Sequence, residues 1–206
     1  MMDQLRGRLG LRGGGEGDEA ARVVHRVVGD YQLAGKLGKG ASGVVFKAIH
    51  RLYGNIVAIK TISTAGISKE EVANIEMEIK LLKELDHPNI IKYIDSQHSA
   101  GALNIVLEYA EGGSLAKMMQ QIEPGCLPAS LVAIYMPQIL NGLVYLHDQG
   151  VVHRDIKAAN ILVGSSGEVR LADFGVAIRQ SLGEQVQGGC AVIFHCHVLS
   201  LQEFSI

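Results

Sequence analysis

The chain has 206 residues and a formal net charge of −2, so it is not a strongly basic polypeptide, and the charge gives no reason to expect a nucleic acid or an anionic membrane surface as a partner. Hydrophobic residues make up 48% of the chain and charged residues 19%. This composition supports a sizeable core and argues against global disorder.

The cysteines and the apolar runs indicate a compartment. Cys126, Cys190 and Cys196 have no paired spacing, which favours reduced thiols. We expect no apolar run to reach the ~20 residues of a membrane span. The N-terminus also lacks the apolar core of a secretory signal. These features predict a cytoplasmic protein without a membrane partner.

The first part of the chain is predicted to be rich in strands. Residues 1–29 are Gly- and Arg-rich, and we expect a flexible leader in which 19–28 form a short helix. Alternating and β-branched residues then predict two strands around a Gly-containing turn over 31–50 and a third strand over 55–63. Further on, the pattern predicts a helix with Ser68 as its N-cap over 68–85 and strands over 90–95 and 102–110.

The second part is predicted to be mostly helical. A short helix over 112–122 with Ser114 as N-cap precedes a long apolar helix over 128–150, which we expect to kink at Pro137. Short strands follow around 159–164 and 168–175. Strands first and helices second predict two unequal lobes, joined near 109–113.

Two features of the first part are typical of phosphate binding. The stretch GKGASGVV has the G-x-G-x-x-G spacing, but its glycines lead from one strand into another and not into a helix. Such a flap lets backbone N–H groups approach phosphates, although an ordinary Gly hairpin stays possible. Lys60 ends the apolar strand VAIK, and an inward-facing Lys needs an anionic partner, for which Glu78 and phosphate are candidates. A Lys that reaches solvent is the alternative.

Six blocks together resemble the eukaryotic protein kinases, in that family's order and spacing: LGKGASGVVFKA, VAIK, MEIKLLKELDHPNI, IVLEYAEGGSL, VVHRDIKAANIL and LADFGVA. The likeness covers 31–179 and is greatest to the sterile-type kinases, in the septation-kinase and epsilon-type mitogen-activated protein kinase kinase kinase class. It implies an α+β bilobal fold with an antiparallel sheet and one helix over 31–109 and an incomplete helical lobe over 110–179. It also implies a serine/threonine kinase that uses ATP and Mg²⁺, acts on protein hydroxyls and has kinase-cascade partners.

The resemblance implies roles for individual residues. Asp155 is expected to orient the substrate hydroxyl, Lys157 to steady the transferred phosphoryl group, and Asn160 and Asp173 to hold Mg²⁺. Lys60 would bind phosphates while Glu78 holds it in place. His153 is expected to pack under Phe174, in one column with Leu82. The remaining nucleotide-binding positions are the flap residues Leu37, Gly38, Lys39, Gly40, Ala41, Ser42, Gly43, Val44 and Val45, and the adenine-site residues Ala58, Leu107, Glu108, Ala110 and Leu162.

The likeness stops after residue 179. No Thr follows Val176, and the family's Gly-Thr-x-x-Tyr and Ala-Pro-Glu are absent, so we expect a chain truncated within the activation loop and a divergent tail over 180–206. Arg154 would contact an activation-loop phosphate, whose Thr is missing. The helix over 130–146 would then leave an apolar face uncovered.

Alternatives remain open for the chain and for its tail. The chain is an active kinase, a fragment that binds ATP or a partner without turnover, or a product with no stable fold. The tail is either a non-native C-terminus or a metal site formed by Cys190, His195, Cys196 and His197. The second interpretation depends on His195 and His197, which alternate in a strand-like run and could share a face.

Overall fold

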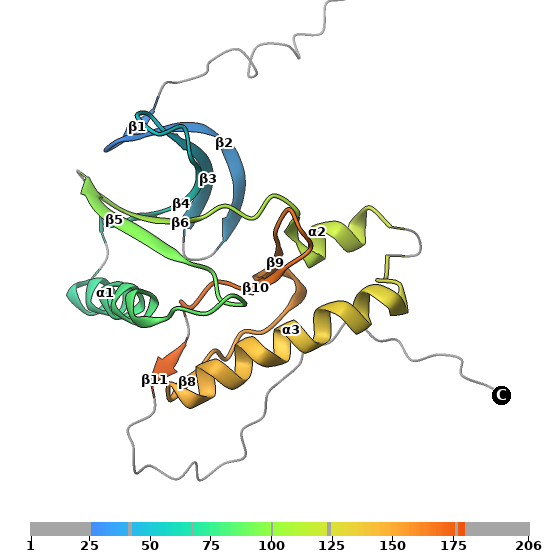
Figure 1. The fold of residues 1–206 in the computed structure, drawn as a ribbon. Helices are drawn as coiled ribbons and strands as arrows, with labels where there is room; N and C mark the ends of the chain where they lie inside the picture. The colour runs from blue at the N-terminus through green and yellow to red at the C-terminus, as the bar shows by residue number, and fades with distance from the viewer. Residues whose placement is uncertain are drawn as a thin grey trace, which may run out of the picture.

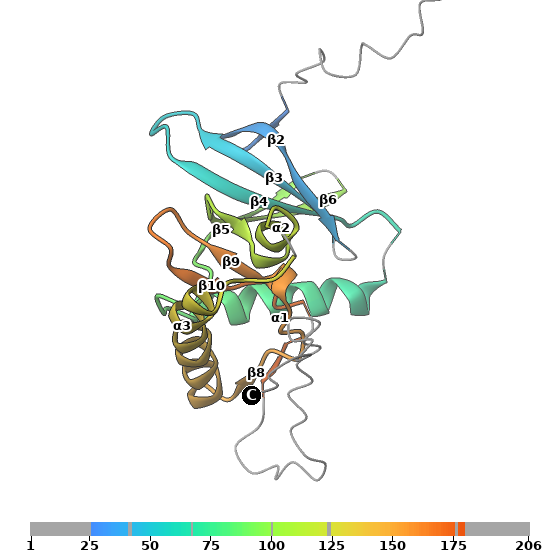
Figure 2. The ribbon, with the colours of Figure 1, turned by 90° about the vertical axis from the view of Figure 1, so that its right-hand side faces the viewer.

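The computed structural model describes residues 26–40, 43–66, 68–99, 101–122, 125–175 and 177–179. These residues form two unequal lobes, as predicted. Figure 1 shows a curled sheet above, with α1 beneath it, and α3 at the bottom, while β9 and β10 lie between the sheet and α3. Figure 2 shows the same layers from the side.

The upper lobe is built on one antiparallel sheet of six strands in the order β1-β2-β3-β4-β6-β5. Its strands are β1 (Val27–Val28), β2 (Tyr31–Gly40), β3 (Gly43–His50), β4 (Ile56–Ser63), β5 (Tyr93–Ser99) and β6 (Ala102–Glu108). Lys60 and Ala58 thus lie on a central strand, between the flap strand β3 and the strand that leads to the lower lobe.

Two boundary predictions in this lobe are wrong. Val27 and Val28 were expected in a helix, but they pair with β2 as a strand. The strand predicted over 90–95 begins only at Tyr93. Before it, the Ile91 N–H donates to the Leu171 carbonyl at 2.9 Å, and the Leu171 N–H donates to the Asn89 carbonyl at 2.8 Å. The segment before β5 therefore pairs with β10 of the lower lobe and connects the two lobes.

Helix α1 (Lys69–Glu84) begins at the predicted N-cap. The Ser68 hydroxyl accepts the Glu71 N–H at 3.2 Å, and the Glu71 carboxylate accepts the Ser68 N–H at 2.7 Å, which is a capping box. The buried side chains of Ile79 and Leu82 lie on one face of this helix. Glu78 directly precedes Ile79, and its carboxylate bonds to Lys60 of the sheet. The cap and the apolar stripe thus place Glu78 for its contact with Lys60.

The lower lobe contains one long helix and several short elements. These are β7 (Gly113–Ser114), α2 (Leu115–Gln120), α3 (Ala129–Asp148), β8 (Val151–Val152), the 3₁₀ helix η1 (Ala158–Asn160), β9 (Ile161–Val163), β10 (Val169–Leu171) and β11 (Ile178–Arg179). Its main buried cluster contains side chains of α1, α3 and β8–β10, so one core extends across both lobes.

Helix α3 continues through Pro137 without interruption. Proline lacks the N–H that would bond the carbonyl four residues earlier, at Ala133. Both Ala133 and Pro137 are exposed, so water can solvate that carbonyl. The helix therefore tolerates Pro137 because the lost hydrogen bond lies on its exposed side.

The faces of α3 differ in burial. Tyr135, Ile139, Leu143 and Leu146 are buried, whereas Ile134, Met136, Leu140 and Val144 are exposed, which confirms the expected apolar face. Among the described residues, α3 is the one helix long and apolar enough to cross a membrane by length and composition, so the expectation that no run reaches that length was wrong. Helices in the cores of soluble proteins have the same length and composition.

Candidate active site

The predicted partner of Lys60 is confirmed at the junction of the lobes. The Lys60 ammonium lies 3.0 Å from the Glu78 carboxylate and 3.0 Å from the Asp173 carboxylate. Lys60 and Glu78 expose only 9% and 8% of their side chains, whereas Asp173 exposes 43%. The lysine therefore does not extend into solvent, and it connects the sheet, α1 and the segment after β10.

The charge on Lys60 is maintained by these partners. Burial alone would lower the pKa of Lys60, but the carboxylates of Glu78 and Asp173 together raise it above its ordinary value. Lys60 is therefore a cation at neutral pH. A buried cation at this junction is suited to an anionic ligand.

Asp155 is oriented by two neighbours in the segment after β8. Its Oδ2 atom lies 2.7 Å from the Lys157 ammonium and accepts from the Asn160 side-chain amide at 2.9 Å. The same amide also donates to the Asp155 carbonyl at 2.9 Å. Within the described part of the chain, no donor is assigned to Oδ1 of Asp155, so this oxygen is available to a hydroxyl group.

The predicted magnesium ligands supply suitable donor atoms. Because the Asn160 amide nitrogen faces two acceptor atoms of Asp155, the amide oxygen must be directed away from them. Asp173 offers a half-exposed carboxylate. Mg²⁺ prefers oxygen ligands and uses few protein groups when phosphates and water complete its shell. The residues therefore fit a magnesium ion bound together with a triphosphate.

The glycine-rich flap is the hairpin of β2 and β3. Leu37, Gly38, Lys39 and Gly40 end β2, and Gly43, Val44 and Val45 begin β3, while Ala41 and Ser42 lie outside the described residues. Gly43 has φ of 139°, and a Cβ there would lie 2.4 Å from the Thr61 carbonyl oxygen. Only glycine fits this approach of β3 to β4.

The predicted adenine-site residues come from both lobes. Ala58 pairs with Leu107 across β4 and β6, and Val45 pairs with Lys60 across β3 and β4. Leu162 is a half-buried residue of β9 in the lower lobe. Ala110 is buried just after β6, and its carbonyl accepts the Gly113 N–H at 3.2 Å.

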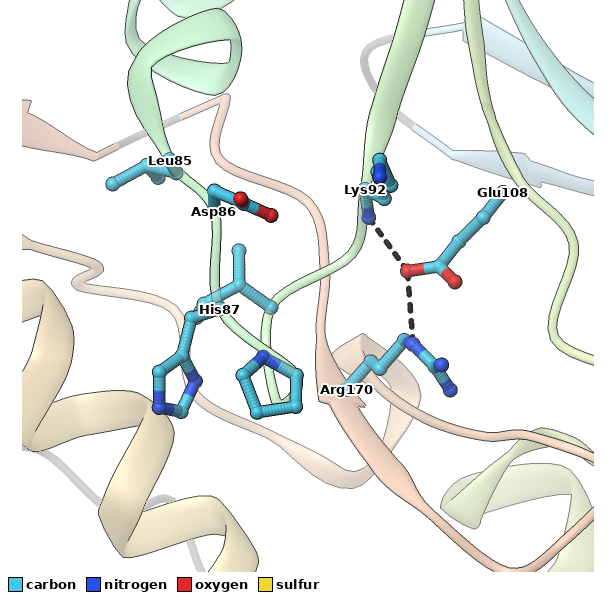
Figure 3. Close-up of a pocket in the computed structure, with 8 residues that line it drawn as sticks. Leu85, Asp86, His87, Lys92, Glu108 and Arg170 are labelled. Carbon is cyan, nitrogen blue, oxygen red and sulfur yellow. Dashed lines mark hydrogen bonds and ion pairs between the residues drawn. The ribbon is translucent and has the colours of Figure 1, made fainter.

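Glu108 ends β6, directly before residues 109–113, the linker between the two lobes. Its carboxylate lies 2.9 Å from Arg170 Nε and accepts the Lys92 N–H at 2.6 Å. Figure 3 shows these contacts. They lie beside a cavity of about 200 Å³, which is lined by Leu85, Asp86, His87, Pro88, Ile90, Lys92, Glu108 and Arg170. Glu108 is the one predicted site residue that lines it, so we do not regard this cavity as the nucleotide site.

His153 has a structural position, as expected. Its ring lies 4.8 Å from that of Phe174, and Leu82 belongs to the same buried cluster as Phe174. His153 Nδ1 accepts the Asp155 N–H at 3.3 Å, and Nε2 lies 3.1 Å from the Ala172 carbonyl oxygen. Only the neutral ring with its proton on Nε2 satisfies both contacts. His153 thus connects the segments that carry Asp155 and Asp173.

Protonation of His153 should weaken the fold. Burial lowers the pKa of His153 below its ordinary value of 6.5, against the opposing influence of the Ala172 carbonyl, Asp155 and Asp173. Below about this pH the unfolded chain therefore binds more protons at His153 than the folded chain does, and the free energy of unfolding decreases as the pH falls. We expect the loss of unfolding free energy between about pH 7.5 and about pH 5.5 to be smaller in His153→Gln, measured by urea denaturation. An equal loss in both proteins would contradict this role.

Two site residues have a strained backbone that sequence reasoning missed. Arg154 and Asp173 have φ of 65° and 66°, in the left-handed region that non-glycine residues rarely adopt. Such residues cluster at functional sites because the surrounding contacts must hold them. Asp tolerates this region, but nothing in the sequence singles out these two positions.

Several sequence-based predictions lie outside the described residues. They are the leader up to residue 25, the tail from residue 180 and its candidate metal ligands Cys190, His195, Cys196 and His197. Of the three cysteines, Cys126 is described, and its thiol is free and exposed. In the described ranges, no group of three or more His, Cys, Asp and Glu side chains is arranged to hold a metal ion.

Comparison with known proteins agrees with this geometry. The sequence profile of the protein kinase domain matches residues 31–194. The chain therefore belongs to the protein kinase family.

Individual relatives are similar over most of this chain. It is 54% identical over 150 residues to cytokinesis protein sepH of Emericella nidulans, which covers 73% of this chain and 11% of the relative. It is 51% identical over 149 residues to MAP3K epsilon protein kinase 1 of Arabidopsis thaliana, with 72% and 11% covered. It is 49% identical over 143 residues to cell division control protein 7 of Schizosaccharomyces pombe, with 69% and 13% covered. The chain thus spans a small part of these relatives.

Proposed function

We propose that this chain is a serine/threonine protein kinase domain that transfers the γ-phosphoryl group of ATP, bound with Mg²⁺, to hydroxyl groups of proteins. The observation that carries the proposal is the convergence of Lys60, Glu78 and Asp173, which are up to 113 residues apart in sequence, beside a loop with Asp155, Lys157 and Asn160. If the ion pair of Lys60 and Glu78 had only a structural role, it would not explain the adjoining loop with Asp155, Lys157 and Asn160.

Each residue has a chemical task in this proposal. Lys60, held by Glu78, binds phosphate oxygens, and the backbone N–H groups of the flap add further donors. Oδ1 of Asp155 accepts a hydrogen bond from the substrate hydroxyl and orients it for in-line attack. Lys157 faces the same carboxylate and balances charge on the transferred group. Asn160 and Asp173 hold Mg²⁺, which supplies charge neutralisation when it is bound.

Adenine recognition is assigned to the linker and to the two surfaces beside it. Val45 and Ala58 cover the base from the sheet, Leu162 supports it from β9, and Leu107 limits the depth of the site. The backbone groups of Glu108 and Ala110 bind the edge of the base. This assignment is supported by the position of these residues on β3, β4, β6 and β9.

Partners and location are part of the proposal. The resemblance to relatives that are named a MAP3K and cytokinesis proteins suggests other members of a kinase cascade as partners. We also propose a cytoplasmic protein that binds neither nucleic acid nor a membrane. The alternative, a fragment that binds ATP without turnover, is not favoured by the relatives.

Phosphoryl transfer tests the proposal directly. The 206-residue chain, incubated with Mg²⁺, γ-labelled ATP and a generic basic protein, is expected to label that protein. Asp155→Asn should bind MgATP normally but label the substrate no more than a reaction without enzyme. The amide oxygen of Asn would face the donors of Lys157 and Asn160, and its NH2 group, which cannot accept a hydrogen bond, would face the hydroxyl.

A matched variant separates this effect from a general one. Asp148→Asn changes the same side chain at the exposed end of α3 and should leave labelling unchanged. Equal labelling by the wild type and Asp155→Asn would reject Asp155 as the catalytic residue. No labelling by the wild type would reject the activity.

A further inference from the structure

One contact between the lobes has no part in the chemistry proposed above. The Lys117 ammonium, on α2, donates to the backbone carbonyl oxygen of Leu37, on β2, at 2.8 Å. The two residues are 80 positions apart in sequence. α2 lies below the sheet in Figure 1, so this bond joins the lower lobe to the strand that leads into the flap.

The lower end of this contact is well anchored. The Ser114 hydroxyl caps α2 by accepting the Lys117 N–H at 3.3 Å. Leu115 exposes 4% of its surface and belongs to the main core, and Ser114 pairs with Leu162 across β7 and β9. The backbone of Lys117 is therefore fixed against the strand that carries the proposed floor of the adenine site.

The upper end of the contact is an irregularity of the sheet. Lys36 pairs with Phe46 and Gly38 pairs with Val45, but Leu37 between them has no partner on β3. Such a bulge removes one residue from the regular ladder, and bulges are frequent next to functional sites. The Leu37 carbonyl accepts from Lys117 instead. Because Gly38 follows directly, the contact is made at the point where the flap begins.

We propose that Lys117 is a positioning residue that ties the base of the flap to the lower lobe and so determines how tightly the site holds ATP. The inference rests on the proposed function. A nucleotide between the flap and Leu162 touches both sides of this contact. Since the contact already holds the two sides together, less freedom is lost when the nucleotide binds. In the described part of the chain, the Lys117 ammonium bonds to Leu37, whereas Asp155 and Lys60 bond to other partners. Lys117 is therefore proposed to act on nucleotide affinity and not on the phosphoryl transfer step.

Replacement of the ammonium tests this role. Lys117→Met keeps the aliphatic stem, and the exposed position should allow normal folding. We expect it to raise the Kd of N-methylanthraniloyl-ATP with Mg²⁺ about threefold to tenfold, in the range for one ordinary, solvent-exposed hydrogen bond. Most of the change should lie in the dissociation rate. The KM for ATP should rise without a fall in kcat, and Lys117→Arg should restore most of the affinity.

The control variant removes a charge from the same strand. Lys36 lies one residue before Leu37 and its side chain is exposed, so Lys36→Met should leave the Kd of N-methylanthraniloyl-ATP unchanged. If the wild type does not bind the probe, both the proposed function and this inference fail. If the wild type and Lys117→Met bind equally, or if Lys117→Met lowers kcat at an unchanged KM, the inference alone is overturned.

Discussion

The free energy of unfolding of Lys60→Met is expected to be about 3–5 kcal/mol lower than that of the wild type, and MgATP should no longer stabilise this variant. The stability loss comes from Glu78, whose side chain is only 8% exposed and would stay buried without the cation that now lies 3.0 Å away. Asp173 contributes less, because it is 43% exposed and water can solvate it. Urea denaturation measures the first effect, and thermal unfolding with and without MgATP measures the second.

A second substitution separates the two effects. In Lys60→Met/Glu78→Gln the buried carboxylate is also removed, so most of the lost stability should return. Nucleotide stabilisation should stay absent, because the phosphates still lack their cation. Lys80→Met, on an exposed position of α1, should differ from the wild type by less than about 0.5 kcal/mol. A double variant no more stable than Lys60→Met would show that Glu78 is not the source of the loss.

The local parts of this site could be predicted from the sequence alone. Alternating residues around the flap glycines predict β2 and β3, and the Ser68–Glu71 spacing with an apolar stripe predicts α1. Those two patterns suffice to suggest that Glu78 meets Lys60, because the strand and the helix follow each other in the chain. Asp155 and Asn160 are five positions apart, so one turn of chain brings them together.

Contacts between distant segments could not be derived from the residues alone. The proximity of Lys60 and Asp173 was implied by the family resemblance, since no local pattern connects residues 113 positions apart. The bond from Lys117 to Leu37 and the pair of Glu108 with Arg170 depend on how the lobes meet. Such contacts reflect tertiary packing, and a surface-like Lys or Arg carries no sign of its partner.

Short strands were mispredicted for a related reason. Val27 and Val28 are only two residues, too few for any periodicity, and the free edge of β2 decides their conformation. The apolar residues Ile90 and Ile91 match a strand equally well, but Asn89 and Ile91 bond to Leu171 and not to the upper sheet. In both places, pairing with a neighbour outweighed local preference.

Phe174→Ala is expected to destabilise the chain by about 3–5 kcal/mol and to lower its melting temperature by roughly 10 °C. Phe174 is 2% exposed, within the cluster that joins α1, α3 and β10, and its ring lies 4.8 Å from that of His153. Its removal leaves a cavity beside the residue that connects Asp155 to Ala172.

Stability and phosphoryl transfer should therefore fall together in this variant. Without the ring, His153 loses the aromatic contact that packs it beside the Ala172 carbonyl, so the support shared by the segments of Asp155 and Asp173 is weakened. Phe174→Leu fills much of the space and should recover most of the unfolding free energy, as calorimetry can measure. If Phe174→Ala melted within about 2 °C of the wild type, the junction of the lobes would not depend on this ring, and the core that extends from α1 to α3 would have to be stabilised elsewhere.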